Sequence, residues 1–266
     1  MIIAVDTGAT KTIVGRFNTD GELLDFHKFP TPQDISDYCQ QTVSHIKNLA
    51  GDQSIATIAL AIPGVVRDGT VVWSANLGWR DLPIQATFQQ LFPEAMIFVD
   101  NDANLAGIAS MRRLATVPRC GLYVTIGTGI GTAVVLDGQI HPALRECEGG
   151  HMIVSYQGHE DSWEQLAAGP ALTERFGMIS DDTAAEAWPE IAERISIGLS
   201  ALVAFIQPDV VVLGGGIGKF TDRFSGLLSG LLAERLPAHT TLPHIVSAPH
   251  PELTVIYGCY DRAIAR

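Results

Sequence analysis

Two glycine-rich turns are the residues of this sequence best suited to chemistry. The first is Asp6-Thr7-Gly8-Ala9-Thr10-Lys11, and the second is Gly127-Thr128-Gly129-Ile130-Gly131. Turns of this kind expose backbone N–H groups at close range, and such groups bind phosphate oxygens. In the first turn the carboxylate of Asp6 is also suited to hold Mg²⁺, directly or through water. A single glycine-rich hairpin is often only structural, but two with the same layout favour a nucleotide held from both sides.

A third glycine run, Gly214-Gly215-Gly216, follows the apolar segment 210–213. Glycines between a buried strand and a helix let the backbone approach a ribose or a flat ring closely. The run is neither a G-x-G-x-x-G motif nor a Walker A loop, because Lys219 follows without the required neighbours. By itself the run is compatible with a nucleotide contact and with a structural turn.

Asn101 and Asp102 stand where a predicted strand ends and a predicted helix begins. Asn and Asp are ordinary helix N-caps, so a structural role is one interpretation. The carboxyl ends of strands in α/β sheets are also where ligands bind. Asp102 is there suited to take a proton from a substrate hydroxyl, as phosphoryl transfer to an alcohol requires.

Acidic and imidazole side chains gather in the glycine-rich and polar segment 142–170. Glu148, His151 and Glu164 are the members whose hydrogen-bonding groups would suit a polyol with several hydroxyls. A lone histidine is more often structural, so the spacing only permits a shared site.

Predicted strands and helices alternate around these residues, which indicates an α/β fold. The predicted strands are 2–29 (a meander), 55–62, 71–73, 96–99, the hairpin 121–141, 210–213 and 245–247. The predicted helices are 33–50, 83–92, 102–114, 184–207, 219–236 and 258–265. The offset of the two glycine turns hints at an internal duplication, and we place a domain boundary between residues 116 and 117, near Pro118.

Composition excludes several classes of protein. The 266 residues carry a net charge of −12 without a Lys/Arg cluster, which argues against a nucleic-acid partner. No apolar run is long enough to span a membrane, and the N-terminus reads as a strand and not as a secretion signal. Four scattered cysteines fit a reducing compartment, so we expect a cytoplasmic protein.

The sequence resembles the ROK family of sugar kinases, within the actin-like/hexokinase ATPase superfamily. The stretches that carry the resemblance, in family order, are 5–11, 62–64, 76–79, 101–104, 127–131, 148–151, 163–164 with 168–169, and 212–216. The resemblance implies two RNase H-like domains around a central cleft: an N-terminal domain over 1–116 and a C-terminal domain over 117–266, with the last helix packed back on the first domain.

The resemblance also implies roles for individual residues. Asp102 resembles the catalytic base. The residues that correspond to sugar contacts are Gly64, Asn76, Asn101, Glu148, His151 and Glu164. The residues expected to bind ATP are Asp6, Gly8, Thr10, Lys11, Thr12, Gly127, Thr128, Gly129, Gly214, Gly215 and Gly216, with Asp6 also on Mg²⁺.

One departure concerns a metal. Many members of the family carry a cysteine-rich zinc loop after the histidine, but the interval from Met152 to Trp163 contains no cysteine. We therefore expect no structural zinc. Zinc would normally fix the orientation of the His151 ring, so without it the sequence does not predict whether this ring faces the sugar. Gly149 replaces the usual aliphatic residue, which is expected to loosen the same loop.

The resulting functional hypothesis is an ATP-dependent kinase that phosphorylates the primary hydroxyl of a hexose, most simply glucose. An N-acetylhexosamine kinase is the alternative, although Val65 and Val66 offer apolar walls and no amide partner. A non-catalytic sugar-binding regulator of the same family is a third. The resemblance further implies a homodimer and leaves open whether polyphosphate replaces ATP.

Overall fold

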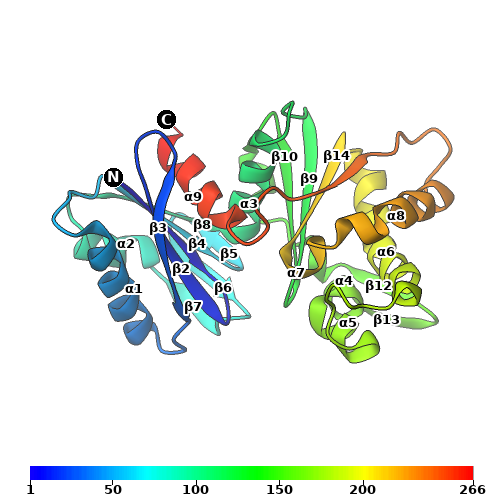
Figure 1. The fold of residues 1–266 in the computed structure, drawn as a ribbon, viewed down its shortest axis with the longest axis horizontal. Helices are drawn as coiled ribbons and strands as arrows, with labels where there is room; N and C mark the ends of the chain where they lie inside the picture. Colours follow the sequence, from blue (N-terminus) through cyan, green and yellow to red (C-terminus); the bar gives the residue numbers. More distant parts are fainter. Residues whose placement is uncertain (266) are drawn as a thin grey trace. The chain divides into compact units, whose positions relative to one another are not determined.

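The computed structural model describes residues 1–265, which form two compact units. Unit 1 comprises Met1–Ala109 and the segment that begins at Leu253, and unit 2 comprises Ser110–Glu252. The division thus falls inside helix α3 (Asp102–Arg112), seven residues before the boundary expected from the sequence. Figure 1 shows the two units, each built on its own sheet.

Unit 1 is centred on a five-stranded sheet with the order β3-β2-β1-β4-β8. The strands, in that order, are β3 (Leu23–Pro30), β2 (Lys11–Phe17), β1 (Ile2–Thr7), β4 (Thr57–Ile62) and β8 (Met96–Asn101). The β1–β2 and β2–β3 pairs are antiparallel, whereas β1, β4 and β8 run parallel. The carboxyl ends of β1, β4 and β8 therefore meet at one edge, where α/β sheets bind ligands.

Helices cover both faces of this sheet because its strands are apolar on both sides. Ile3 and Val5 of β1 pack in one core with α1 (Ile35–Ala50) and α2 (Ile84–Leu91). Ala4, between them in β1, packs on the opposite face with Leu105 of α3 (Asp102–Arg112) and with α9 (Thr254–Ile264). The last helix therefore belongs to the core of unit 1 although it is far away in sequence.

A small second sheet follows β4. It contains β5 (Val65–Arg67), β6 (Thr70–Ser74) and β7 (Trp79–Leu82) in that order. Gly64 makes the turn into this sheet with a φ of 98°, a backbone conformation that residues with a side chain rarely adopt. A Cβ at that position would also overlap the backbone of Trp73.

Unit 2 has a five-stranded sheet with the order β11-β10-β9-β14-β15. In that order the strands are β11 (Gln139–Ile140), β10 (Ile130–Leu136), β9 (Cys120–Ile126), β14 (Val210–Gly214) and β15 (His244–Ser247). The first two pairs are antiparallel and the last two are parallel, as in unit 1. The same order with the same directions agrees with the duplication that the sequence hints at.

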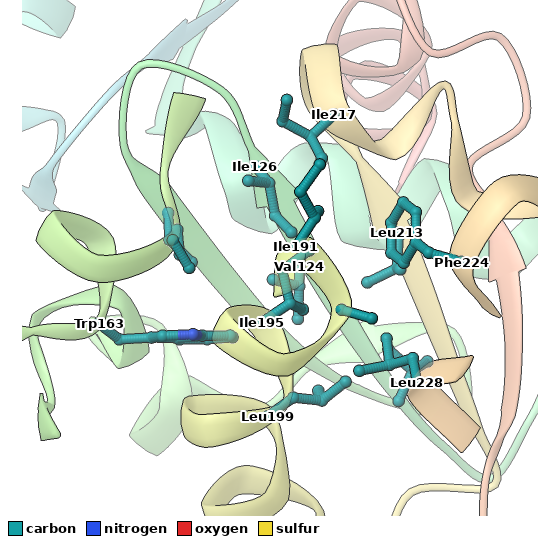
Figure 2. Close-up of a cluster of buried hydrophobic side chains, with 14 of the residues drawn as sticks. Val124, Ile126, Trp163, Ile191, Ile195, Leu199, Leu213, Ile217, Phe224 and Leu228 are labelled. Atoms are coloured by element: carbon teal, nitrogen blue, oxygen red, sulfur yellow. The ribbon is translucent and has the colours of Figure 1, made fainter. Parts of the chain in front are cut away.

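The helices of unit 2 are α4 (Trp163–Ala167), α5 (Gly169–Phe176), α6 (Trp188–Ile206), α7 (Gly215–Gly218) and α8 (Thr221–Arg235). Side chains from α6 and α8 pack on Val124 and Leu213 of the sheet, and the indole of Trp163 lies beside α6 in the same cluster (Figure 2). Within the described residues, no helix is long and apolar enough to cross a membrane.

The segment 142–170 is more ordered than the sequence indicated. It contains two 3₁₀ turns, η1 (Pro142–Leu144) and η2 (Gly149–His151), and a hairpin of β12 (Ile153–Tyr156) and β13 (His159–Ser162). The hairpin was missed because its strands are only four residues long and the second, His159–Ser162, is entirely polar. Its turn, Gln157-Gly158, has positive φ at both residues, as a tight hairpin turn requires.

Gly198→Ala is expected to lower the free energy of unfolding by about 2 to 3 kcal/mol, because overpacking a rigid core is destabilising. A Cβ at Gly198 of α6 would overlap the indole ring of Trp163, which is fully buried. Urea denaturation measures the change. Gly226→Ala in α8 is the matched control: no atom lies within 4 Å of its Cβ position, so it is expected to gain up to about 1 kcal/mol from helix propensity. An equal change in the free energy of unfolding in the two variants would contradict the packing argument.

Candidate active site

The first glycine turn joins β1 to β2 and is braced from inside. The N–H of Gly8 donates to the carbonyl of Lys11 at 2.9 Å, and the hydroxyl of Thr31 donates to the carbonyl of Gly8 at 2.7 Å. The hydroxyls of Thr12 and Thr31 are 2.9 Å apart, and Thr12 is fully buried. Thr10 and Lys11 are exposed at the rim. The sequence predicts Thr12 among the ATP-binding residues, but in the structure its buried hydroxyl bonds Thr31 and so supports the turn from inside.

Asp6 precedes this turn, close to the carboxyl end of β1. Burial raises the pKa of its carboxyl group to about 7, Asp102 adds to the rise, and the charge of Lys11 opposes it. A cation beside Asp6 would favour its ionised form, and Mg²⁺ usually binds one or two carboxylates together with substrate phosphates. The oxygen donor and its setting fit magnesium, so Asp6 is the residue that would hold it.

Asn101 connects the end of β8 to two backbone groups. Its side-chain amide donates to the carbonyl of Gly64 at 2.8 Å, and its side-chain oxygen accepts from the N–H of Asn104 at 2.9 Å. Asn101 thus caps α3 and at the same time fixes the turn before β5. Both polar atoms have protein partners, which is the structural role that the sequence left open beside sugar binding.

Asp102 begins α3 at the same edge of the sheet. One carboxylate oxygen accepts from the N–H of Ala103 at 2.8 Å. Burial raises the pKa of Asp102 above its usual value, and hydrogen bonds from the backbone N–H groups of Ala103 and of Asp102 itself oppose that rise. A carboxylate of raised basicity at a strand end is suited to accept a proton from an alcohol.

A partly buried ion pair from α9 supports the end of β8. Nε of Arg262, on α9, lies 3.9 Å from a carboxylate oxygen of Asp100, and its guanidinium stacks 4.2 Å from the centre of the Phe98 ring. The last helix thus stabilises the strand that delivers Asn101 and Asp102.

The second glycine turn joins β9 to β10 and touches a carboxylate. The N–H of Gly127 donates to the carbonyl of Gly129 at 2.9 Å. No atom lies within 4 Å of a Cβ at Gly127, whereas a Cβ at Gly129 would lie 2.7 Å from Oε2 of Glu164. The same carboxylate oxygen is 3.4 Å from the N–H of Ile130. Gly127 therefore leaves open space for a phosphate chain, and Thr128 between the two glycines is exposed.

Glu164 also faces His151. Its Oε1 lies 3.4 Å from Nδ1 of His151, so the two predicted sugar contacts lie together in unit 2. Glu148 is half-buried and immediately precedes the turn η2 that carries His151. Thr128, Glu164 and the first turn of α5 line one surface pocket of about 280 Å³. The second phosphate turn and a predicted sugar contact thus share a pocket.

The glycines before His151 pack tightly and do not loosen the loop. The N–H of Gly149 donates to the hydroxyl of Thr132 at 2.9 Å, and a Cβ there would lie 2.8 Å from that hydroxyl oxygen. A Cβ at Gly150 would overlap the carbonyl of Ile130. An aliphatic residue at position 149 would therefore clash in this chain.

The third glycine run begins α7 after β14. A Cβ at Gly214 would overlap the ring of Tyr123, and one at Gly215 would lie 2.5 Å from the carbonyl of Ile126. Gly215 has a φ of 76°. Only Gly216 has no atom within 4 Å of its Cβ position. Gly214 and Gly215 are needed for packing, and Gly216 has the open space for a ligand.

The remaining predicted residue, Asn76, is exposed in the loop between β6 and β7. Within residues 1–265, no group of three or more His, Cys, Asp or Glu side chains could hold a metal ion; the absence of zinc stays a prediction. Sequence reasoning missed Thr31, which braces the first turn from β3. No local signal marks it, because its partners are 19 and 23 residues away.

The repeated sheet and the helices on both faces define the class of protein. The chain has the two-domain α/β fold of actin-like ATPases. The profile of the ROK family matches residues 2–251, and the chain belongs to this family.

Individual relatives agree with this assignment. The chain is similar to a polyphosphate glucokinase of Mycobacterium tuberculosis (strain CDC 1551 / Oshkosh), with 30% identity over 231 residues that cover 84% of this chain and 80% of the relative. It is 26% identical over 254 residues to a fructokinase of Pediococcus pentosaceus, covering 85% of this chain and 86% of the relative. A crystal structure of a ROK family glucokinase from Streptomyces griseus in complex with glucose and AMPPNP superposes with a TM-score of 0.85 at 21% identity, covering 98% of both chains.

Proposed function

We propose that this protein, a ROK sugar kinase, transfers the γ-phosphoryl group of ATP to the primary hydroxyl of a hexose, glucose being the preferred acceptor. The observation that carries the proposal is Asp102, a partly buried carboxylate of raised pKa at the carboxyl end of a parallel strand. General-base catalysis at an alcohol requires a group of this kind.

Each unit supplies a distinct part of the chemistry. In unit 1 Asp102 accepts the proton of the attacking hydroxyl, and the turn around Gly8 with Lys11 binds phosphate oxygens. In unit 2 the turn of Gly127 and Gly129 binds phosphate. Glu164 and His151 form hydrogen bonds with the hydroxyls of the sugar. Mg²⁺ at Asp6, when bound, neutralises charge on the phosphates. The protein thus acts by positioning and by electrostatic stabilisation, which dominate phosphoryl transfer.

Glucose is favoured over an N-acetylated sugar by the apolar character of β5. Val65 and Val66 supply no amide partner for an acetyl group. The two relatives described above are named for glucose and for fructose, and another relative is named for kanosamine, so the acceptor is the part of the proposal that most needs a direct test.

An ADP-release assay with a panel of sugars tests the proposal. The panel contains glucose, fructose, mannose, N-acetylglucosamine and N-acetylmannosamine. Turnover with ATP is followed by ADP release, turnover with polyphosphate by the sugar phosphate formed, because polyphosphate yields no ADP, and NMR of the product locates the phosphate. We expect the highest kcat/KM for glucose with ATP and phosphate on the primary hydroxyl. A higher kcat/KM for an N-acetyl sugar would favour the hexosamine alternative. Sugar binding without turnover by any donor would identify a regulator and overturn the kinase.

A further inference from the structure

The β12–β13 hairpin lies in the chain between the two residues assigned to sugar binding in unit 2. At its base the N–H of Trp163 donates to the carbonyl of Met152 at 2.8 Å. Met152 follows His151 and Trp163 precedes Glu164, so this bond brings the two side chains together. The geometry of the His151–Glu164 pair therefore depends on how firmly the hairpin is held.

The hairpin is too small to hold itself. It is a two-stranded sheet, separate from the main sheet of unit 2, and Ile153 in its first strand is 71% exposed. An isolated two-stranded hairpin is marginally stable in water. Contacts with another element must therefore fix it.

Val154 and Tyr156 pack against the hydrophobic cluster of unit 2, and the polar and cation–π contacts of Tyr156 come from α6. The hydroxyl of Tyr156, at the end of β12, donates to Oε2 of Glu193 at 3.2 Å. The guanidinium of Arg194 lies over the Tyr156 ring, 5.3 Å from its centre. Stacking of Arg on an aromatic ring combines cation–π attraction with a preorganised planar group.

Arg194 also holds the helix that carries Glu164. Its Nη1 donates to the carbonyl of Leu166 in α4 at 3.3 Å. Its Nε and Nη2 both donate to Oε1 of Glu190, at 3.1 and 2.9 Å. The side chain is only 16% exposed. One guanidinium thus joins α6 to the hairpin that follows His151 and to α4, the helix that carries Glu164.

We propose that Arg194 is a positioning residue for sugar binding: by fixing the hairpin and α4 together, it holds His151 and Glu164 in the geometry that receives the hexose hydroxyls. The inference rests on the proposed function and adds to it a residue that itself touches no substrate. The planar fork of donors makes lysine a poor substitute at this place.

Arg194→Met tests the proposal, because methionine keeps the apolar stem and removes every donor. We expect the KM for the hexose and its Kd by calorimetry to rise about tenfold, the effect of about 1.4 kcal/mol of lost binding free energy. We expect kcat and the KM for ATP to stay within about twofold, because the hydrogen bonds of Arg194 go to Glu190 and Leu166 and the second glycine turn is closed by its own Gly127–Gly129 backbone bond. Arg194→Lys should recover only part of the loss.

Arg175→Met is the matched control. Nε and Nη2 of Arg175 also donate to Glu190, each at 3.2 Å. Its side chain is 59% exposed, and these two hydrogen bonds reach neither the hairpin nor α4. Its hexose KM is expected to be unchanged. Tyr156→Ala, which removes the ring and the hydroxyl together, gives a second route to the same readout if Arg194→Met folds poorly.

Three results would overturn the inference. The first is an unchanged hexose KM and Kd in folded Arg194→Met and Tyr156→Ala, with increases in His151→Ala and Glu164→Gln. The second is a fall of kcat with equal changes in both KM values, which indicates a general loss of structure. The third is an equal effect of Arg175→Met. Failure of the proposed function is distinct, because it appears as absent turnover in the wild-type protein, where calorimetry with the hexose still tests Arg194.

Discussion

Asp102→Asn is expected to lower kcat by about 10²-fold or more, with hexose binding retained, because a general base contributes about 10² to 10⁴ to such reactions. Asparagine keeps the size of the side chain and an oxygen that can accept from the N–H of Ala103. It removes the group that takes the proton of the sugar hydroxyl. Coupled assays give kcat, and calorimetry gives the Kd for the hexose.

The control for this variant is Asp222→Asn, which makes the same change in the first turn of α8. It is expected to have wild-type kcat, since a carboxylate near a helix N-terminus stabilises by only about 0.3 to 1 kcal/mol. Near-normal turnover in Asp102→Asn would remove Asp102 from the mechanism. Loss of hexose binding together with turnover would assign it to binding and not to proton transfer.

Asp6→Asn is expected to gain stability relative to the wild type as the pH rises, while it loses the carboxylate that we propose would hold magnesium. The pKa of Asp6 is about 7 in the folded protein against 3.8 ordinarily. Between these values the folded state retains a proton that the unfolded state has lost, so the free energy of unfolding of the wild type falls with rising pH and levels off above about pH 7. Asparagine has no such proton, and its stability lacks this slope.

The expected difference can be measured by urea denaturation at several pH values. The stability of Asp6→Asn relative to the wild type should increase by about 2 kcal/mol between pH 5.5 and pH 8, at about 1.4 kcal/mol per unit of pKa. Because Lys11 lowers the pKa of Asp6, Lys11→Met should move the levelling of the slope to higher pH. A difference between Asp6→Asn and the wild type that does not change with pH would contradict the raised pKa.

The same variant links stability to function. A carboxylate held in a site that opposes its charge destabilises the free protein, and a divalent cation removes that penalty when it binds. Asp6→Asn is therefore expected to need a higher Mg²⁺ concentration for half-maximal activity, measured at fixed ATP and hexose. Unchanged magnesium dependence would show that another group holds the metal.

Much of the fold was predictable because its signals are local. Apolar residues at helical spacing between Asp34 and Gly51 predict α1, and in the structure Asp34 caps its start and Gly51 its end. The α/β class and the ROK family were both predicted and are confirmed. The β12–β13 hairpin escaped prediction, because each strand has only four residues and neither shows the apolar/polar alternation that marks a strand in a sequence.

The sequence predicts candidate site residues, but it does not show which of them are bound to partners within the protein. Thr12 and Thr10 look equivalent in sequence, yet Thr12 is fully buried against Thr31. Asn101 looks like a ligand for sugar, yet its amide is bonded to Gly64, 37 residues away. The partners that decide these roles come from other strands, which no local pattern specifies.

The sequence by itself determined the family, the α/β class and the glycine turns, because turn geometry and strand or helix preference depend on neighbouring residues. Only the tertiary structure decided the pKa values of Asp6 and Asp102, the contact of Glu164 with Gly129 and the place of Arg194. These properties depend on burial and on charges brought together from distant parts of the chain.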